Sequence, residues 1–243
     1  MNHFGLIGYP LTHSFSKKYF DQKFIEKHIH DASFSLWELE NINQLPELIK
    51  STVGIKGICI TIPYKKKVLE YLDESDDAVK AIGACNCIKI KNDKLFGYNT
   101  DILGFKLSFM NNLQPNHKKA LVLGSGGASA GIEYVLKELN IEYLIVSRQN
   151  LSNNINYTDI SDEMINDYQI IINCTPLGTY PNIDTCPPLP YDTMTSSNYL
   201  FDLVYNPEET LFLKKGKEKG AIIQNGYDML VHQAEENWRI WNS

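Results

Sequence analysis

Residues 119–129, with the sequence KALVLGSGGAS, decide the fold class of this chain. We predict a strand over residues 120–124 and a helix over residues 127–139, joined by a turn that contains Gly124, Gly126 and Gly127. Glycines permit such a tight turn and let backbone N–H groups approach a pyrophosphate, which then faces the positive end of the helix. Ser129 occupies the position of the third glycine in the usual pattern. The strand–turn–helix context favours a dinucleotide-binding site over a plain structural turn.

The next predicted strand, over residues 143–147, ends at Ser147 and is followed by Arg148. In dinucleotide-binding folds an acidic residue at this place binds a ribose hydroxyl, whereas an arginine accommodates the 2′-phosphate of NADP. Arg148 has no acidic residue next to it, so the sequence favours NADP over NAD. A solvated surface arginine is the alternative interpretation.

Strands and helices alternate through the rest of the chain, apart from a break at residues 114–116. We predict further strands over residues 4–8, 33–40, 57–63, 84–90, 94–98, 169–173 and 200–204, and helices over residues 14–27, 44–51, 64–72, 101–112, 208–219 and 226–241. Asn92 and Asp93 mark a tight hairpin turn, and residues 150–159, rich in Asn and Ser, are expected to form a loop. The alternation predicts an α/β fold with parallel sheets that carry helices on both faces.

The composition limits the class of protein. With 243 residues, 43% of them hydrophobic, the chain can bury the core of one large domain or of two smaller ones. A net charge of -6 argues against non-specific nucleic-acid binding, and a charged fraction of 21% argues against global disorder. No signal peptide or membrane-spanning stretch is visible, and the five scattered cysteines form neither a disulfide framework nor a zinc motif. We therefore expect a cytoplasmic protein without a metal ion.

Polar residues stand at the ends of the predicted elements in the first half of the chain. Ser14 and Ser16 suit a carboxylate ligand, although serine is also a favoured helix-capping residue. Lys65 follows a strand end, where ligands of α/β proteins bind, although it also belongs to a lysine run typical of a solvated helix face. Asn86 and Asp101 hold similar positions, where polar residues usually form turns. Each signal is weak alone, and their co-occurrence favours a binding site.

Eight motifs, in order along nearly the whole chain, make it resemble the shikimate dehydrogenase family. They are Gly8-x-Pro10 with His13-Ser14-x-Ser16; Thr61-Ile62-Pro63-x-Lys65; Gly83-Ala84-x-Asn86; Asn99-Thr100-Asp101; Gly124-x-Gly126-Gly127-Ala128; Asn173-x-Thr175-Pro176-Leu177-Gly178; Asp202-Leu203-x-Tyr205-Asn206-Pro207; and Asn225-Gly226-x-x-Met229-Leu230 with Gln233-Ala234. The resemblance implies reversible reduction of 3-dehydroshikimate to shikimate by NADPH, in aromatic amino-acid biosynthesis.

The resemblance also implies the domain organisation. A substrate-binding domain would comprise residues 1–102 plus 226–243, so that the C-terminal helix returns to it, and a Rossmann-like NADP-binding domain would comprise residues 103–225. We expect a monomer or homodimer whose partner is its small-molecule substrate, with no nucleic-acid or membrane partner.

The family's functional residues carry over to matching positions of this chain. Lys65 and Asp101 would form the acid–base pair. The substrate would be bound by Ser14, Ser16, Thr61, Lys65, Asn86, Asp101, Tyr205 and Gln233. NADP would be bound by Asp77, Gly124, Ser125, Gly126, Gly127, Ala128, Ser147, Arg148, Thr175, Leu203 and Gly226. Hydride transfer to a ring carbonyl leaves an alkoxide, which a neighbouring ammonium can stabilise and protonate.

Several positions depart from the family's pattern. Lys17 replaces a proline, Tyr64 replaces a histidine and Ser147 replaces an asparagine. Residues 150–153 lack the second basic residue expected near Arg148, which predicts weaker binding of the 2′-phosphate.

Two alternatives stay open beside an NADP-dependent shikimate dehydrogenase. One is a quinate/shikimate dehydrogenase of broader specificity that uses NAD or NADP. The other is a non-catalytic dinucleotide-binding module, against which the intact Lys65 and Asp101 argue.

Overall fold

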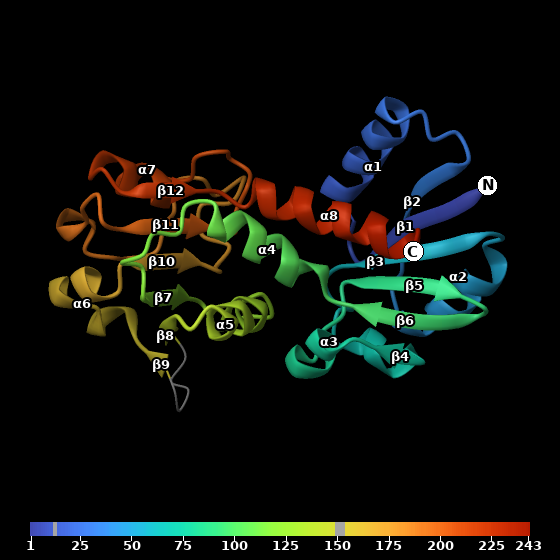
Figure 1. Ribbon diagram of the computed structural model, residues 1–243, viewed down its shortest axis with the longest axis horizontal. Helices are drawn as coiled ribbons and strands as arrows, with labels where there is room; N and C mark the ends of the chain where they lie inside the picture. Colours follow the sequence, from blue (N-terminus) through green and yellow to red (C-terminus); the bar gives the residue numbers. More distant parts are fainter. Residues whose placement is uncertain (12–13, 149–153) are drawn as a thin grey trace. The chain divides into compact units, whose positions relative to one another are not determined.

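The computed structural model describes residues 1–11, 14–148 and 154–243. His13 and residues 150–153 lie outside the described residues. The chain divides into two compact units (Figure 1): unit 1 comprises Met1–Gly104 and Leu230–Ser243, and unit 2 comprises Phe105–Met229. Each unit is built around a six-stranded sheet.

The sheet of unit 1 is mixed, with the strand order β2-β1-β3-β5-β6-β4. Its strands are β1 (Asn2–Gly8), β2 (Ala32–Glu38), β3 (Ile55–Ile60), β4 (Glu74–Ser75), β5 (Cys87–Lys91) and β6 (Lys94–Tyr98). β1 pairs in parallel with β2 and β3, as predicted, whereas β5 runs antiparallel to both β3 and β6. The antiparallel part follows from the predicted hairpin, because Asn92 and Asp93 turn the chain with φ of 52° and 59°.

Helices cover both faces of this sheet because side chains alternate along its strands. On one face, Phe20 of α1 (Phe15–Glu26) and Trp241 of α8 (Tyr227–Trp241) pack with Phe4 and Phe34 of the strands. Gly57 of β3 lies directly under that indole, since a Cβ there would come within 2.2 Å of the Trp241 nitrogen. A side chain at this position would displace the last turn of α8.

The opposite face is covered by shorter helices. Leu45 of α2 (Leu45–Ser51), Val79 of α3 (Asp77–Ile82) and Val68 pack there against the strands. Val68 belongs to a 3₁₀ helix, Lys67–Tyr71, which is shorter than the helix predicted over residues 64–72. The preceding residues form a turn instead, closed by a 2.9 Å bond from the Tyr64 N–H to the Thr61 carbonyl.

The sheet of unit 2 is parallel throughout, in the order β12-β11-β10-β7-β8-β9. Its strands are β7 (Lys119–Leu123), β8 (Glu142–Val146), β9 (Asn154–Ile155), β10 (Ile170–Asn173), β11 (Tyr199–Asp202) and β12 (Ile222–Gln224). The chain starts in the middle, moves outward through β9, and returns to the centre at β10. This is the doubly wound Rossmann order, in which ligands bind where the strand order reverses, here between β7 and β10.

Helices also pack on both faces of the second sheet (Figure 1). Phe105 and Phe109 of α4 (Thr100–Met110) stack at 5.0 Å and contact Phe201 of β11. α5 (Ser129–Glu138) follows β7. A separate cluster contains Ile165 of α6 (Asp162–Asp167) and Phe212 of α7 (Leu211–Glu218).

Residues 154–159, which were predicted to belong to a loop, include two short regular elements. β9 pairs with β8, and a 3₁₀ helix at Tyr157–Asp159 follows it. Asn156 and Asp159 cap that helix reciprocally, with a 2.8 Å bond from the Asn156 N–H to the Asp159 carboxylate. Asn156 and Asp159 therefore serve as helix-capping residues. Along the described residues, no helix combines the length and the apolar character needed to cross a membrane.

Candidate functional site

One edge of the unit 1 sheet brings together four of the predicted substrate-binding residues. Because β5 is antiparallel to β3 and β6, with Cys87 paired to both Cys59 and Tyr98, the end of β3, the start of β5 and the end of β6 lie together. The residues just beyond these strand ends include Thr61, Lys65, Asn86 and Asp101.

Lys65 and Asp101 form an ion pair at this edge, with Lys65 Nζ 2.7 Å from Asp101 Oδ2. Their side chains are 37% and 26% exposed, so both are accessible to a ligand. The backbone of Lys65 is held by a 2.8 Å bond from the Cys85 N–H to its carbonyl. The adjacent Tyr64 is buried and donates its hydroxyl to the Leu39 carbonyl. The tyrosine that departs from the family pattern therefore anchors the segment that carries Lys65.

Asn86 is buried and holds Thr100, the residue that precedes Asp101. Its Oδ1 accepts the backbone N–H of Thr100 at 2.7 Å, and its Nδ2 lies 3.1 Å from Thr100 Oγ1. Gln233, on α8, is also buried and donates from Nε2 to the Leu230 carbonyl at 2.9 Å. Both amides are thus fixed by neighbours rather than free to rotate.

Ser14 has the capping role that serine favours. It is the N-cap of α1, where its Oγ accepts the Lys17 N–H at 3.2 Å. The hydroxyl hydrogen of a capping serine stays available, so capping does not prevent Ser14 from donating to a carboxylate. Ser16 is half-buried in the first turn of the same helix.

Cys59, at the end of β3, is an unsuitable nucleophile. Burial raises the pKa of the Cys59 thiol well above its usual range, and the charge of Asp101 raises it further. The thiol is therefore protonated at neutral pH. Among the described residues, no group of three or more His, Cys, Asp or Glu side chains is arranged to hold a metal ion.

The glycine turn of unit 2 has the backbone that pyrophosphate binding needs. Gly124 has φ of 102°, which favours glycine, and a Cβ there would lie 3.0 Å from Thr175 Cγ2, after β10. Gly126 and Gly127 have open space where a Cβ would be. Ser129 is buried and closes the turn with a 2.7 Å bond to the Gly126 carbonyl. The serine at the position of the third glycine therefore binds the backbone of the turn.

The neighbouring strand ends carry the other predicted cofactor residues of unit 2. Ser147 Oγ lies 3.0 Å from Ser125 Oγ, and Arg148 is exposed. Thr175 donates from Oγ1 to Asn173 Oδ1 at 2.6 Å, and Asn173 donates to Asp202 at 2.9 Å. Residues from β7, β8 and β10 therefore meet where the strand order reverses.

Asp202 and Asn173 were not assigned a role from the sequence, although both lie in motifs of the family. Asp202 is fully buried and also accepts Thr210 Oγ1 at 2.6 Å. Burial raises its pKa to about 6, despite the hydrogen bonds that lower it. Asp202 holds Asn173 and, through it, Thr175 beside the glycine turn.

The remaining predicted residues are divided between the two units. Asp77, in unit 1, has a side chain 98% exposed and pairs with Lys80 at 3.4 Å. Tyr205, in unit 2, is 38% exposed. Gly226 packs against Leu203, since a Cβ at Gly226 would come within 2.3 Å of the Leu203 carbonyl oxygen.

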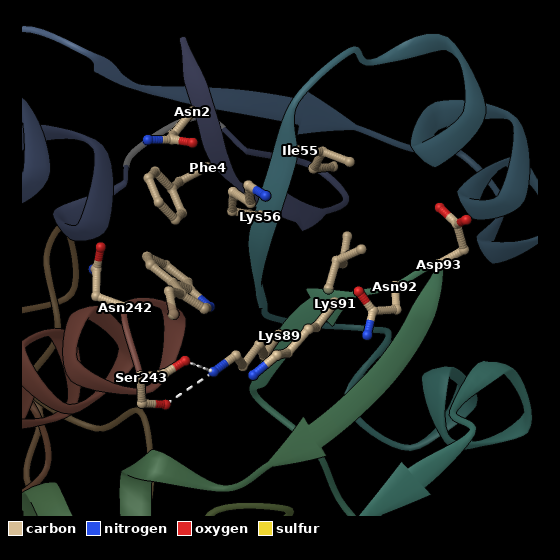
Figure 2. Close-up of a pocket in the computed structure, with 12 residues that line it drawn as sticks. Asn2, Phe4, Ile55, Lys56, Lys89, Lys91, Asn92, Asp93, Asn242 and Ser243 are labelled. Atoms are coloured by element: carbon tan, nitrogen blue, oxygen red, sulfur yellow. Dashed lines mark hydrogen bonds between the residues drawn. The ribbon is translucent and has the colours of Figure 1, made fainter.

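Two hollows in unit 1 involve other residues. One, of about 370 Å³, lies where β1 and β3 begin, among residues that include Asn2, Ile55 and Lys56 (Figure 2). Lys89 lies on its wall and donates to the main-chain oxygen and to Oγ of Ser243. The other, of about 520 Å³, lies beside β4 and α3. Neither is lined by a residue of the predicted site.

Comparisons with known proteins support the resemblance seen in the sequence. The family model described as the shikimate dehydrogenase substrate binding domain matches residues 6–88. The shikimate dehydrogenase (NADP(+)) of Clostridium beijerinckii is 41% identical over 254 residues, which cover 99% of this chain and 92% of that protein.

Solved structures give the same result over the whole chain. The crystal structure of shikimate dehydrogenase from Aquifex aeolicus has a TM-score of 0.87 and 30% identity, covering 100% of this chain and 92% of that one. Shikimate 5-dehydrogenase from Thermus thermophilus, solved in complex with NADP(H) and shikimate, has a TM-score of 0.82 and 27% identity, covering 99% and 93%.

Proposed function

The chain belongs to the shikimate dehydrogenase family, and we propose that it catalyses the NADP-dependent, reversible reduction of 3-dehydroshikimate to shikimate. The observation that carries this proposal is the accessible ion pair of Lys65 and Asp101, 2.7 Å apart, at an edge where other polar side chains gather. The relative from Clostridium supports the cofactor, and the relative from Thermus supports both ligands.

Lys65 is the proposed general acid and base. When hydride reaches the carbonyl carbon of 3-dehydroshikimate, the oxygen gains negative charge, which the Lys65 ammonium stabilises and then protonates. In the reverse direction, neutral Lys65 accepts the hydroxyl proton of shikimate as hydride leaves the same carbon. Asp101 orients the ammonium and accepts a hydrogen bond from a ring hydroxyl.

Unit 1 supplies the other proposed substrate contacts. Ser14 and Ser16 donate hydroxyl hydrogens to the substrate carboxylate, with Tyr205 of unit 2 as a third donor. Thr61, Asn86 and Gln233 bind the ring hydroxyls. The family model for a substrate-binding domain, which matches residues 6–88, supports assigning this part of the chain to the substrate.

Unit 2 is the proposed NADP-binding unit, and the residues of its glycine turn fit the pyrophosphate of NADP. Open backbone at Gly126 and Gly127 lets the pyrophosphate approach the N–H groups of the turn. Ser125, Ala128, Ser147 and Thr175 line the same place, and Arg148 binds the 2′-phosphate. Leu203 and Gly226 of unit 2 and Asp77 of unit 1 complete the proposed set. NADP, when bound, supplies or accepts the hydride.

Replacing Lys65 by alanine tests the proposal. General acid–base catalysis contributes about a hundred- to ten-thousand-fold, so Lys65→Ala is expected to lower kcat by at least about a hundredfold with a modest change in KM for shikimate. The measurement is the absorbance change of NADP and NAD with shikimate and with quinate, at saturating concentrations.

Lys66→Ala is the matched control, since Lys66 is the exposed neighbour of Lys65 in the same lysine run. Its kcat is expected to equal that of the unmodified protein. A Lys65→Ala variant with near-normal kcat contradicts the acid–base role. Faster turnover of quinate than of shikimate, or a preference for NAD, contradicts the proposed specificity.

We further propose a cytoplasmic location and a monomeric or homodimeric state. Free cysteines support the location, because thiols persist in a reducing compartment.

A further inference from the structure

The buried asparagine Asn237, on α8, connects the proposed substrate-binding residues of unit 1. We propose that Asn237 is a positioning residue. It sets the orientation of the Gln233 amide, and it fixes the position of Thr100, the residue before Asp101. The inference rests on the proposed function for the roles of Gln233 and Asp101.

Both ends of the Asn237 amide are used. Its Oδ1 accepts the Thr100 hydroxyl at 2.7 Å, and its Nδ2 donates to Gln233 Oε1 at 3.1 Å and to Cys59 Sγ at 3.3 Å. The residue has no exposed surface. A buried amide whose oxygen and both N–H groups are bonded holds its neighbours in one arrangement.

Gln233 can adopt only one amide orientation beside this residue. Its Oε1 accepts from Asn237, and its Nε2 donates to the Leu230 carbonyl at 2.9 Å. Rotating the amide by half a turn would place two donors together at Asn237 and two acceptors together at Leu230. The second N–H of Gln233 and a lone pair of its Oε1 are therefore presented in fixed directions to a ring hydroxyl.

Thr100 connects Asn237 to the helix that carries Asp101. Its hydroxyl donates to Asn237, and its Oγ1 accepts from Asn86 Nδ2 at 3.1 Å. Its backbone N–H donates to Asn86 Oδ1 at 2.7 Å. Thr100 is the first residue of α4 and Asp101 is the second, so these bonds fix the helix start from which the Asp101 carboxylate reaches Lys65.

The first test compares Asn237→Ala with the unmodified protein. Loss of the orienting bonds is expected to lower kcat/KM for shikimate about tenfold, mainly through a higher KM. The KM for NADP is expected to change by less than about twofold, because no proposed cofactor residue bonds to Asn237. If the cavity in Asn237→Ala prevents folding, Asn237→Val removes the same bonds while filling more of the space.

Asn198→Ala is the matched control. Asn198 is another buried asparagine, in unit 2, whose Oδ1 accepts the Thr195 N–H at 2.8 Å and whose Nδ2 donates to the Ile165 carbonyl at 3.1 Å. Its loss is expected to lower the Tm without changing KM for shikimate. A structural role for Asn237 would give the same pattern, and an unchanged KM in Asn237→Ala overturns the proposal.

A double-mutant cycle with Gln233→Ala tests whether Asn237 acts through Gln233. When the glutamine is already absent, Asn237→Ala is expected to lower kcat/KM further by less than about threefold, because only the Thr100 path is left. Equal tenfold losses in both backgrounds mean independent action, and they overturn the positioning role.

A measurement without substrate separates this inference from the proposed function. The side-chain amide signals of Gln233 in ¹⁵N NMR spectra are assigned by their loss in Gln233→Ala. Their heteronuclear NOE is expected to fall to mobile values in Asn237→Ala and to stay unchanged in Asn198→Ala. Rigid Gln233 signals in Asn237→Ala overturn the inference, whereas failure of the unmodified protein to oxidise shikimate refutes only the proposed function.

Discussion

Replacing Asp202 by asparagine is expected to remove a loss of stability that unit 2 suffers as the pH rises. The Asp202 carboxyl group is buried at the end of β11, where it accepts hydrogen bonds from Thr210, Asn173 and the N–H of Val204 at 2.6, 2.9 and 3.0 Å. Burial raises its pKa from 3.8 to about 6, because the cost of desolvating the carboxylate outweighs these bonds.

The sign of the effect follows from proton binding. Between pH 3.8 and about 6 the folded protein keeps a proton on Asp202 that the unfolded chain has released. The free energy of unfolding therefore falls as the pH rises through this range. The difference between the two pKa values lowers the free energy of unfolding by about 3 kcal/mol over the whole titration. About 2 kcal/mol of this loss occurs between about pH 4 and pH 7. Asp202→Asn lacks this titration but keeps an oxygen acceptor.

Hydrogen exchange of the β10 and β11 amides, measured by mass spectrometry, reports on unit 2. The two proteins should have similar protection near about pH 4. By about pH 7, the free energy of opening calculated from the protection should be about 2 kcal/mol higher in the variant than in the unmodified protein. The three tryptophans, Trp37, Trp238 and Trp241, all lie in unit 1. Their fluorescence during urea unfolding is therefore an internal control for effects outside unit 2.

Comparing the two proteins at each pH cancels the titration of the other acidic groups. If their protection changes in parallel from about pH 4 to pH 7, Asp202 does not titrate in this range and the reasoning is refuted. A variant that is less stable at every pH would mean that hydrogen-bond geometry, rather than desolvation, dominates at this site.

Two further predictions concern cofactor binding. Arg148→Ala is expected to raise KM for NADP by about tenfold or more and to leave KM for NAD unchanged, because it removes charge-assisted bonds to the 2′-phosphate; equal shifts for both cofactors in steady-state kinetics contradict this. Gly124→Ala is expected to lower the stability of unit 2 by about 1–2 kcal/mol and to weaken NADP binding, because of the positive φ and the approach to Thr175. Thermal unfolding with and without NADP measures both effects, and an unchanged Tm under both conditions rules out the strain.

The sequence was most informative where one residue type determines the backbone. Asn92 and Asp93 located the hairpin, and β6 has the predicted bounds Lys94–Tyr98. By contrast, α3 was not predicted, although Asp76 caps it and Gly83 ends it with φ of 68°. The helix has six residues and only Val79 buried, so it lacks the apolar period that reveals longer helices.

The candidate site was predictable as a set of residues but not as an arrangement. The motifs named Lys65 and Asp101, whereas their 2.7 Å separation depends on the antiparallel strands of unit 1. Asn237 was not predicted, because an asparagine in an amphipathic helix usually faces water. Its burial follows from contacts with Cys59 and Thr100, which are 178 and 137 positions away in the chain.

Unit 1 is built from both ends of the chain, and this fixes an order of assembly during synthesis. The ribosome makes Phe105–Met229 in full before Leu230. Throughout that time Phe4, Phe20 and Phe34 lack the Trp241 ring against which they pack. The aromatic residues of unit 1 therefore stay without this partner until the whole sequence of unit 2 has been made. Fragments that end before residue 230 lack both Trp241, which completes this core, and Gln233.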